Sequence, residues 1–380
     1  MPAPRSTRLK VSQAPGSKGF TLVGRSHAVA AAITFVVLVV VAGMNGMSAE
    51  ARSLPLSSTV VLGAWTEGMD ADPTRLTTVE GLLGRQLGVA SIFRGATEVF
   101  PTQADVSLTA GGRRRLLVSW HLDTDRFSAW ASGQHDAELD RTAAAVRDYG
   151  RPLYIRPWAE MNADWVDFQP TADGAKAKGG TPAEFIAAWR HVVERFRAVG
   201  ATNARWVFNP TADTYLETTP VASIWPGAAY VDVLGLDGYN WGTGGALRWR
   251  SFTDVFATQY RRLTTLAPKL PVWICETSSA DPSSTAQTAT VTAPIGQSKG
   301  IWWREAMAST SMPKVTTVVL FSALKERDWR IDSSAEALQG LRAALGSGGT
   351  SPTTVRRPMG AQVEPQHRQV AISTAVKRSR

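Results

Sequence analysis

The 380-residue chain contains a single cysteine, Cys275, and only five histidines. One cysteine excludes an intramolecular disulfide framework. Because Cys275 stands directly before Glu276 in an apolar, strand-like run, we expect a buried structural thiol rather than a nucleophile. The histidines are scattered without metal-ligand spacing, so we expect no catalytic metal and no other cofactor.

The central part of the chain has no net charge, although the whole chain carries a formal charge of +9. Residues 1–51 hold five basic residues and one acidic residue, and residues 349–380 hold six and one. Residues 52–348 therefore contain as many acidic as basic residues. A neutral domain argues against nucleic acid as the partner of the folded part.

The N-terminal residues 1–27 contain no acidic side chain, and residues 28–44 form an almost wholly apolar run that is followed by Ala49-Glu50-Ala51. A basic segment, an apolar segment and a small-x-small site are typical of a secretory signal peptide. The apolar run is long for a signal, so an uncleaved membrane anchor is the alternative. In either case we expect a secreted or extracytoplasmic domain, with membrane contact only through residues 28–44 if the segment stays uncleaved.

The opposite end of the chain, residues 349–380, is basic and follows a Gly/Ser-rich stretch. This composition predicts a disordered tail.

Between these ends, eight strand-like segments alternate with helical patterns. The helix that begins at Thr181-Pro182-Ala183-Glu184 has a capping box and is followed by Gly200. A doubly wound sheet would alternate in the same way, but no glycine-rich dinucleotide fingerprint follows the first strand. We therefore predict that residues 52–348 form one monomeric (β/α)8 barrel. The expected strands are 60–65, 89–94, 116–120, 152–156, 206–209, 231–237, 272–276 and 315–321.

Polar and aromatic residues fall at or just beyond the ends of these strands. In a barrel the carboxyl ends of the strands share one face, where active sites form. Glu160 and Glu276 fall at or just beyond the ends of two apolar, strand-like runs, and two carboxyl groups are what glycoside hydrolysis requires. The other residues at or beyond strand ends are Trp65, Arg94, His121, Asn209, Asp237 and Tyr239.

The sequence Arg-Pro-Trp-Ala-Glu-Met-Asn-Ala-Asp-Trp at 156–165 resembles the acid/base motif of glycoside hydrolase family 26, which holds β-mannanases and β-1,3-1,4-glucanases. The resemblance continues, in the same order, through 196–210, 225–241, 271–277 and 321–332. It implies that Glu160 is the general acid/base and Glu276 the nucleophile of a reaction that retains the anomeric configuration. It also implies that Tyr239 is the candidate to donate a hydrogen bond to the nucleophile, and a core tyrosine is the alternative.

Several further residues are candidates for substrate binding. Trp165 and Trp241 suit stacking on sugar rings, and ordinary packing is the alternative for each. Asn162 and Asp237 either bind substrate hydroxyls or orient other site residues, and Arg156 favours an ionised carboxylate nearby. His121 is expected in the wall of the site or as a structural histidine.

The chain departs from the family pattern directly before the acid/base residue. The family usually has His where this chain has Ala159, and commonly Gly where it has Ala163. This puts plain mannan in doubt as the substrate. The prediction is a hydrolase of internal bonds in β-mannan, glucomannan or mixed-linkage β-glucan. The alternative is a polysaccharide-binding protein of the cell envelope that has lost turnover.

Overall fold

A computed structural model of the chain describes residues 55–213, 219–287 and 290–346. The expectations for residues 1–51 and 349–380 lie outside these ranges. No helix of the described residues is long and apolar enough to cross a membrane.

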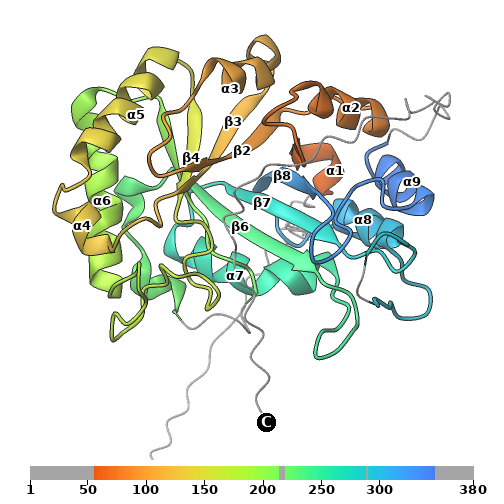
Figure 1. Ribbon diagram of the computed structural model, residues 1–380. Helices are drawn as coiled ribbons and strands as arrows, with labels where there is room; N and C mark the ends of the chain where they lie inside the picture. Colours follow the sequence, from red (N-terminus) through yellow and green to blue (C-terminus); the bar gives the residue numbers. More distant parts are fainter. Residues whose placement is uncertain (1–54, 214–218, 288–289, 347–380) are drawn as a thin grey trace, which may run out of the picture. The chain divides into compact units, whose positions relative to one another are not determined.

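Eight parallel strands close into a barrel in sequence order, with β8 hydrogen-bonded to β1, and helices surround them (Figure 1). This confirms the predicted (β/α)8 barrel. The strands are β1 (Val61–Thr66), β2 (Val89–Gly95), β3 (Arg115–His121), β4 (Leu153–Pro157), β5 (Ala204–Phe208), β6 (Val233–Asn240), β7 (Val272–Ser279) and β8 (Val315–Ser322). The helices are α1 (Leu56–Thr59), α2 (Thr74–Leu83), α3 (Gln103–Leu108), α4 (Phe127–Ala131), α5 (Asp136–Tyr149), α6 (Pro182–Val199), α7 (Phe252–Leu266), α8 (Lys299–Ala308) and α9 (Ala335–Ala344), with short 3-10 turns at Ala110–Gly112, Val221–Ile224 and Ala228–Tyr230.

Helix α6 shows how local sequence sets these bounds. The Thr181 hydroxyl accepts a hydrogen bond from the Glu184 backbone N–H, and the Glu184 carboxylate accepts one from the Thr181 backbone N–H, as the capping box predicts. Gly200 ends the helix at φ 86°, a left-handed conformation that glycine adopts without steric cost. The apolar face between these caps is fully buried against the barrel.

The barrel interior is filled by inward-pointing strand residues, as in other barrels of this type. They form one small cluster that is separate from the larger core between strands and helices: Val89, Leu117, Val207, Val233, Trp273, Cys275 and Val319. Cys275 is thus a buried thiol, as predicted, and burial raises its pKa above the ordinary value. Such a thiol is inert at neutral pH.

The predicted ends of the sixth and seventh strands were too early, because β6 continues to Asn240 and β7 to Ser279. Strand β7 also contains a β-bulge. Leu236 of β6 pairs with Ile274, but the next residue, Asp237, pairs with Glu276. Cys275 is the extra residue, and the strand resumes its pairing beyond it.

The bulge re-aims side chains, since successive residues of a regular strand point to opposite faces. Trp273 and Cys275 both belong to the barrel interior, so Glu276 in a regular strand would face the surrounding helices. Its carboxylate instead bonds to groups from β4 and β6 at the mouth of the barrel. The extra residue places the side chains of Cys275 and Glu276 on the same, inner side.

Candidate active site

Arg156 is the buried centre of the site. It lies near the end of β4 with no exposed surface, and its guanidinium donates hydrogen bonds to Ser119 Oγ (2.6 Å), Asp237 Oδ2 (2.7 Å) and Glu276 Oε1. Burial disfavours the charged guanidinium, but the adjacent carboxylates of Asp237 and Glu276 more than offset this and raise the pKa of Arg156. The arginine therefore stays charged and holds two acids in a fixed arrangement.

Both oxygens of the Glu276 carboxylate are hydrogen-bonded. Arg156 donates to Oε1, and the Tyr239 hydroxyl donates to Oε2 at 2.7 Å. Burial, followed by the charge of Glu276, raises the pKa of Tyr239 well above its ordinary value, so the phenol keeps the proton that it donates. The Glu276 side chain is 13% exposed, which leaves it accessible from the mouth of the barrel.

Glu160 lies three residues beyond β4, in a turn with unusual backbone geometry. Its φ is 61° and that of Trp158 is 48°, both in the left-handed region that non-glycine residues seldom adopt. The Glu160 backbone N–H donates to the Asn209 carbonyl at the end of β5 (2.8 Å), and the Trp158 indole donates to the Leu122 carbonyl (2.9 Å). Such strain persists where surrounding contacts fix it, and it clusters at functional sites.

The carboxyl group of Glu160 is held protonated near neutral pH. Burial, and then the negative charge of Glu276, raises its pKa to about 8. The indole of Trp165 opposes this, because its N–H donates to Glu160 Oε2 at 3.1 Å and lowers the pKa. The site thus pairs a protonated carboxyl with a carboxylate that is hydrogen-bonded on both oxygens.

Two residues that were predicted either to bind substrate hydroxyls or to orient other site residues are buried, as is the central arginine. Asp237 is buried and bonded to Arg156, and burial raises its pKa well above the ordinary value. Asn162 is also buried, and both polar atoms of its amide bond to the Thr211 backbone (2.8 and 3.2 Å). Neither these side chains nor Arg156 has surface free for a substrate, which favours the orienting role over direct contact.

The aromatic candidates lie around the mouth. Trp165 is half-buried and bonded to Glu160. Trp241 is half-buried in a cluster with Tyr239 and Trp329, and the Tyr239 and Trp329 rings are 4.8 Å apart. Trp241 therefore packs against other aromatic rings of the site. The indoles of Trp165 and Trp241 both remain partly exposed.

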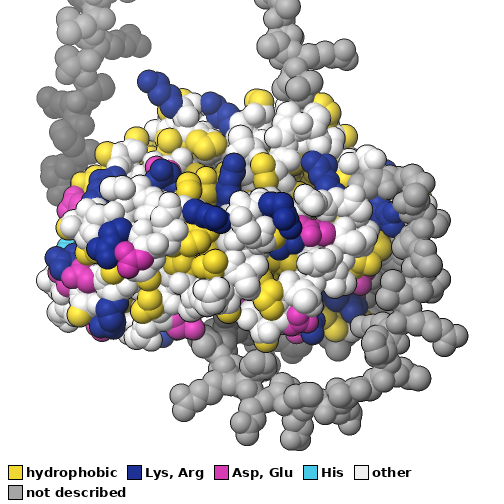
Figure 2. Space-filling view, turned by 90° about the horizontal axis from the view of Figure 1, so that it is seen from above, with side chains coloured by type: hydrophobic (Ala, Val, Ile, Leu, Met, Phe, Trp, Pro, Cys, Tyr) yellow, Lys and Arg dark blue, Asp and Glu magenta, His cyan; other side chains and the backbone are white. Residues whose placement is uncertain are grey.

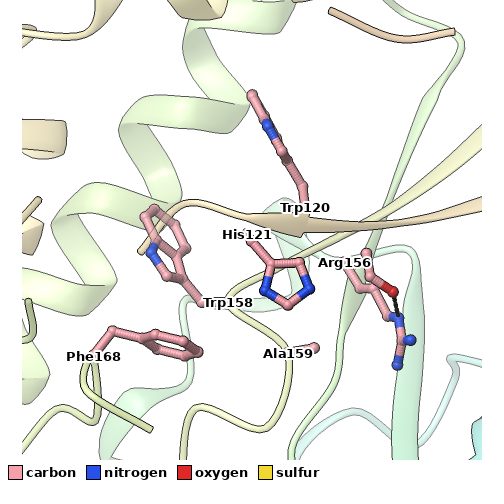
Figure 3. Close-up of a pocket in the computed structure, with 7 residues that line it drawn as sticks. Trp120, His121, Arg156, Trp158, Ala159 and Phe168 are labelled. Atoms are coloured by element: carbon pink, nitrogen blue, oxygen red, sulfur yellow. Dashed lines mark hydrogen bonds between the residues drawn. The ribbon is translucent and has the colours of Figure 1, made fainter. Parts of the chain in front are cut away.

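His121 lines a small pocket with Ser119, Trp120, Arg156, Trp158, Ala159 and Phe168 (Figure 3). Its ring lies above the methyl group of Ala159 in that view. The pocket has a volume of about 10 Å³, which is room for about one water molecule. Burial lowers the pKa of His121 below its ordinary value, so the ring is neutral at neutral pH.

Sequence reasoning missed two residues of the site. Trp329 lies in the loop after β8 and packs on Tyr239, and no periodicity marks that loop. Asp213 follows β5 at a distance of five residues, is buried, and forms an ion pair with Arg250. Its charge also contributes to the raised pKa of Glu160. A carboxylate soon after a barrel strand was the available signal for Asp213. Among the described residues, no group of three or more His, Cys, Asp and Glu side chains is arranged to hold a metal ion.

A (β/α)8 barrel with a protonated glutamic acid and a hydrogen-bonded glutamate at its mouth has the features of a glycoside hydrolase. Comparison with known proteins agrees. The family model described as Glycosyl hydrolase family 26 matches residues 118–272. This chain belongs to glycoside hydrolase family 26.

Individual relatives are similar to different extents. The chain is 34% identical over 328 residues to Endoglucanase H of Acetivibrio thermocellus, which covers 84% of this chain and 34% of that protein. It is 35% identical over 107 residues to mannan endo-1,4-beta-mannosidase A and B of Caldalkalibacillus mannanilyticus, covering 27% of this chain and 20% of that one. The chain thus spans about a third or less of the length of these relatives.

The solved GH26 domain of an endo-beta-mannanase/endo-beta-glucanase from Prevotella bryantii has the same fold, with a TM-score of 0.50. The two chains are 15% identical, and the match covers 76% of this chain and 92% of that one. At this identity the likeness concerns the fold alone.

The raised pKa of Glu160 predicts the shape of the pH–rate profile. If Glu160 must donate a proton, kcat/KM is expected to fall as pH rises through about 8. Trp165→Phe removes the hydrogen bond that lowers this pKa, so the alkaline limb should move upward by up to about one pH unit. Trp241→Phe, which touches neither carboxyl oxygen, is the matched control. An alkaline limb that stays in place or moves downward in Trp165→Phe would contradict the assignment.

Proposed function

We propose that this protein hydrolyses β-glycosidic bonds inside a polysaccharide chain by double displacement, with retention of configuration. The observation that carries the proposal is the opposite environment of the two glutamates. Glu160 keeps a proton near neutral pH, whereas Glu276 accepts hydrogen bonds from Arg156 and Tyr239. A retaining glycosidase needs one carboxyl in each of these states.

In the first step, Glu276 attacks the anomeric carbon, and Glu160 gives its proton to the departing glycosidic oxygen. Arg156 and Tyr239 already hold the Glu276 carboxylate in place, so the site needs little reorganisation when a Glu276 oxygen forms the ester bond. The products of this step are a glycosyl-enzyme ester and the released chain end.

The second step reverses the role of Glu160. Once Glu276 is an ester it carries no charge, and the repulsion that raised the Glu160 pKa is removed. Glu160 can then hold a negative charge more readily and take a proton from water. The water oxygen attacks the anomeric carbon as the ester bond to Glu276 breaks, which releases the sugar and restores the Glu276 carboxylate. The same carboxyl thus serves as acid and then as base because its partner changes charge.

For the substrate we propose a β-glucan, with mixed-linkage β-1,3-1,4-glucan preferred over plain β-1,4-mannan. The support is the similarity to Endoglucanase H over most of this chain, and Ala159 beside the small, mostly aromatic pocket. Direct comparison of kcat/KM on mixed-linkage glucan, β-1,4-mannan, glucomannan and β-1,3-xylan, with product configuration followed by NMR, tests the proposal. Absence of hydrolysis on all of them would favour the binding-protein alternative.

Position 159 offers a sharper test of specificity. Ala159→His adds an imidazole to the wall of the pocket next to His121, so a polar ring replaces an apolar methyl group there. We expect the ratio of kcat/KM for mixed-linkage glucan over mannan to fall by about tenfold, which corresponds to about 1.4 kcal/mol. Ala159→Leu adds similar bulk without polarity and is the control. A wild-type protein that already prefers plain mannan would contradict this proposal.

We also propose that the barrel acts outside the cytoplasm, on the strength of the basic, apolar and small-residue segments in residues 1–51. N-terminal sequencing of the protein from its own cells is the measurement. A new N-terminus near Arg52 identifies a cleaved signal, and residue 1 in the membrane fraction identifies an anchor.

A further inference from the structure

The two ends of the barrel carry opposite charge, although the domain as a whole is neutral. The segments that lead into the strands contain ten basic and two acidic residues: 84–88, 109–115, 147–152, 197–205, 225–232, 266–271 and 309–314. The described segments that follow the strands contain fifteen acidic and eight basic residues: 67–73, 96–102, 122–126, 158–181, 209–213, 241–251, 280–287, 290–298 and 323–334. The end with the glutamates is therefore negative, and the opposite end is positive.

Of the ten basic side chains at the positive end, only Arg114 and Arg147 form ion pairs within the described ranges. Six of the other eight make up what we call the basic pole: Arg113, Arg115, Arg151, Arg205, Lys269 and Lys314. Four of the six are exposed. The other two are half-buried and donate only to backbone carbonyls, Arg205 to Thr202 and Ala204, and Lys314 to Pro268.

Seen from above, the Lys and Arg side chains stand around the centre of the face, and most acidic ones lie toward its edges (Figure 2). This view looks onto the side where α5 ends and where β3 and β4 begin, as Figure 1 shows. The positive charge is thus spread over a face and is not confined to a groove.

The rest of the chain joins the barrel at the same end. The described chain begins at Pro55, just before β1, and Leu56 N–H donates to the Ser309 carbonyl of a segment that leads into β8. It ends after α9, where the Leu345 carbonyl accepts from Arg85 of the segment that leads into β2. Residues 1–54, with the apolar run 28–44, and residues 347–380, with six basic side chains, therefore connect to this end.

We propose that the basic pole rests on an anionic lipid bilayer, so that the glutamates at the opposite end face away from it. Basic side chains beside a membrane are attracted by anionic headgroups within about one Debye length, about 8 Å at physiological salt. A bilayer fits better than nucleic acid because the charges cover a broad face. The chain that continues from this end in both directions also contains an apolar run and further basic residues in its sequence. This inference is independent of the reaction assigned to the site.

The test is the orientation of the full-length chain on vesicles. Cys275 is buried and inert, so a fluorophore can be attached to one new cysteine, Thr202→Cys at the basic pole or Ile295→Cys at the opposite end. On phosphatidylglycerol-rich vesicles that contain brominated lipid, quenching is expected to be at least about threefold stronger at position 202 than at 295. The difference should vanish on pure phosphatidylcholine and at about 1 M salt, where the Debye length is about 3 Å.

Charge-reversal variants test how much the basic pole itself contributes to vesicle binding, because residues 1–54 and 347–380 are the same in all variants. The pole variant carries Arg113→Glu, Arg115→Glu and Lys269→Glu, and the matched control carries Lys178→Glu, Arg248→Glu and Lys325→Glu at the negative end. The pole variant should lose the quenching at position 202, and the control should keep it.

Three results would overturn the proposal. The first is equal quenching at both positions, or stronger quenching at the exposed Ile295. The second is that quenching at position 202 is lost in both the pole variant and the matched control, or is kept in both. The third is tighter binding to a double-stranded DNA oligomer than to the vesicles at the same salt, with loss of this binding in the pole variant. That result would assign the surface to nucleic acid instead.

Discussion

Replacing Glu276 with glutamine is expected to abolish turnover on every substrate, with a loss of at least about 10⁴-fold in kcat. The amide cannot attack the anomeric carbon, so no glycosyl-enzyme forms. The glutamine carbonyl can still accept from Arg156, and its NH2 group can donate to the Tyr239 hydroxyl oxygen, so the site should keep its shape. The measurement is pre-steady-state release of an activated aryl leaving group, which should show no burst.

The alanine variant at the same position distinguishes the effect of Glu276 on catalysis from its effect on the stability of the fold. Glu276→Ala leaves the buried guanidinium of Arg156 with one carboxylate partner, Asp237, instead of two. Breaking part of a buried charged network costs about 1–3 kcal/mol, so this variant should unfold at a lower temperature than Glu276→Gln while being equally inactive. If Glu276→Gln kept more than about 1% of the wild-type activity, the assignment of Glu276 as the nucleophile would be wrong.

Glu160→Ala is expected to fail at a different step. A substrate with a good leaving group, such as a dinitrophenyl glycoside, needs little protonation and should still release its aryl group in a rapid burst. Natural polysaccharide should lose about 10²–10⁴-fold in rate, because its leaving group needs the acid. After the burst, the glycosyl-enzyme should accumulate, since no base activates water.

A small anion provides the decisive control for this role. Azide needs no general base, so it should accelerate turnover of Glu160→Ala and yield a glycosyl azide of retained configuration, with no effect on Glu276→Gln. Trp165→Phe, which leaves the acid in place, should not respond to azide. An inverted product, or equal loss of the burst in both glutamate variants, would contradict the double-displacement assignment.

Much of the fold could be predicted from the sequence because the signals were local. The capping box at Thr181–Glu184 and Gly200 bound α6 as predicted, and the eight apolar runs became eight strands. The two glutamates were recognisable as residues at or just beyond the predicted ends of apolar strands. The hydrogen bond between Tyr239 and Glu276 matches what the family resemblance implied, and the structure places it at 2.7 Å.

The remainder of the site depends on contacts between distant segments, which no local pattern encodes. The amide of Asn162 is occupied by the backbone of Thr211, 49 residues later. Arg156 reaches Asp237 across 81 residues, and Trp329 packs on Tyr239 from the last loop. Burial of Arg156 and Asp237 follows from the closed barrel and not from the residues nearby in sequence.

The extra residue in β7 shows that the direction of Glu276 is set by its strand partner. Cys275 can be exchanged for another small apolar residue while Glu276 stays aimed at the mouth of the barrel. Deleting Cys275 would remove the bulge, and Glu276 would then follow Ile274 directly, still opposite Asp237 and still on the inner side, because the residue after the outward-facing Ile274 points inward. The pairing with Asp237, and not the spacing from Trp273, therefore fixes where Glu276 points, so among homologues this spacing should be able to differ by one residue.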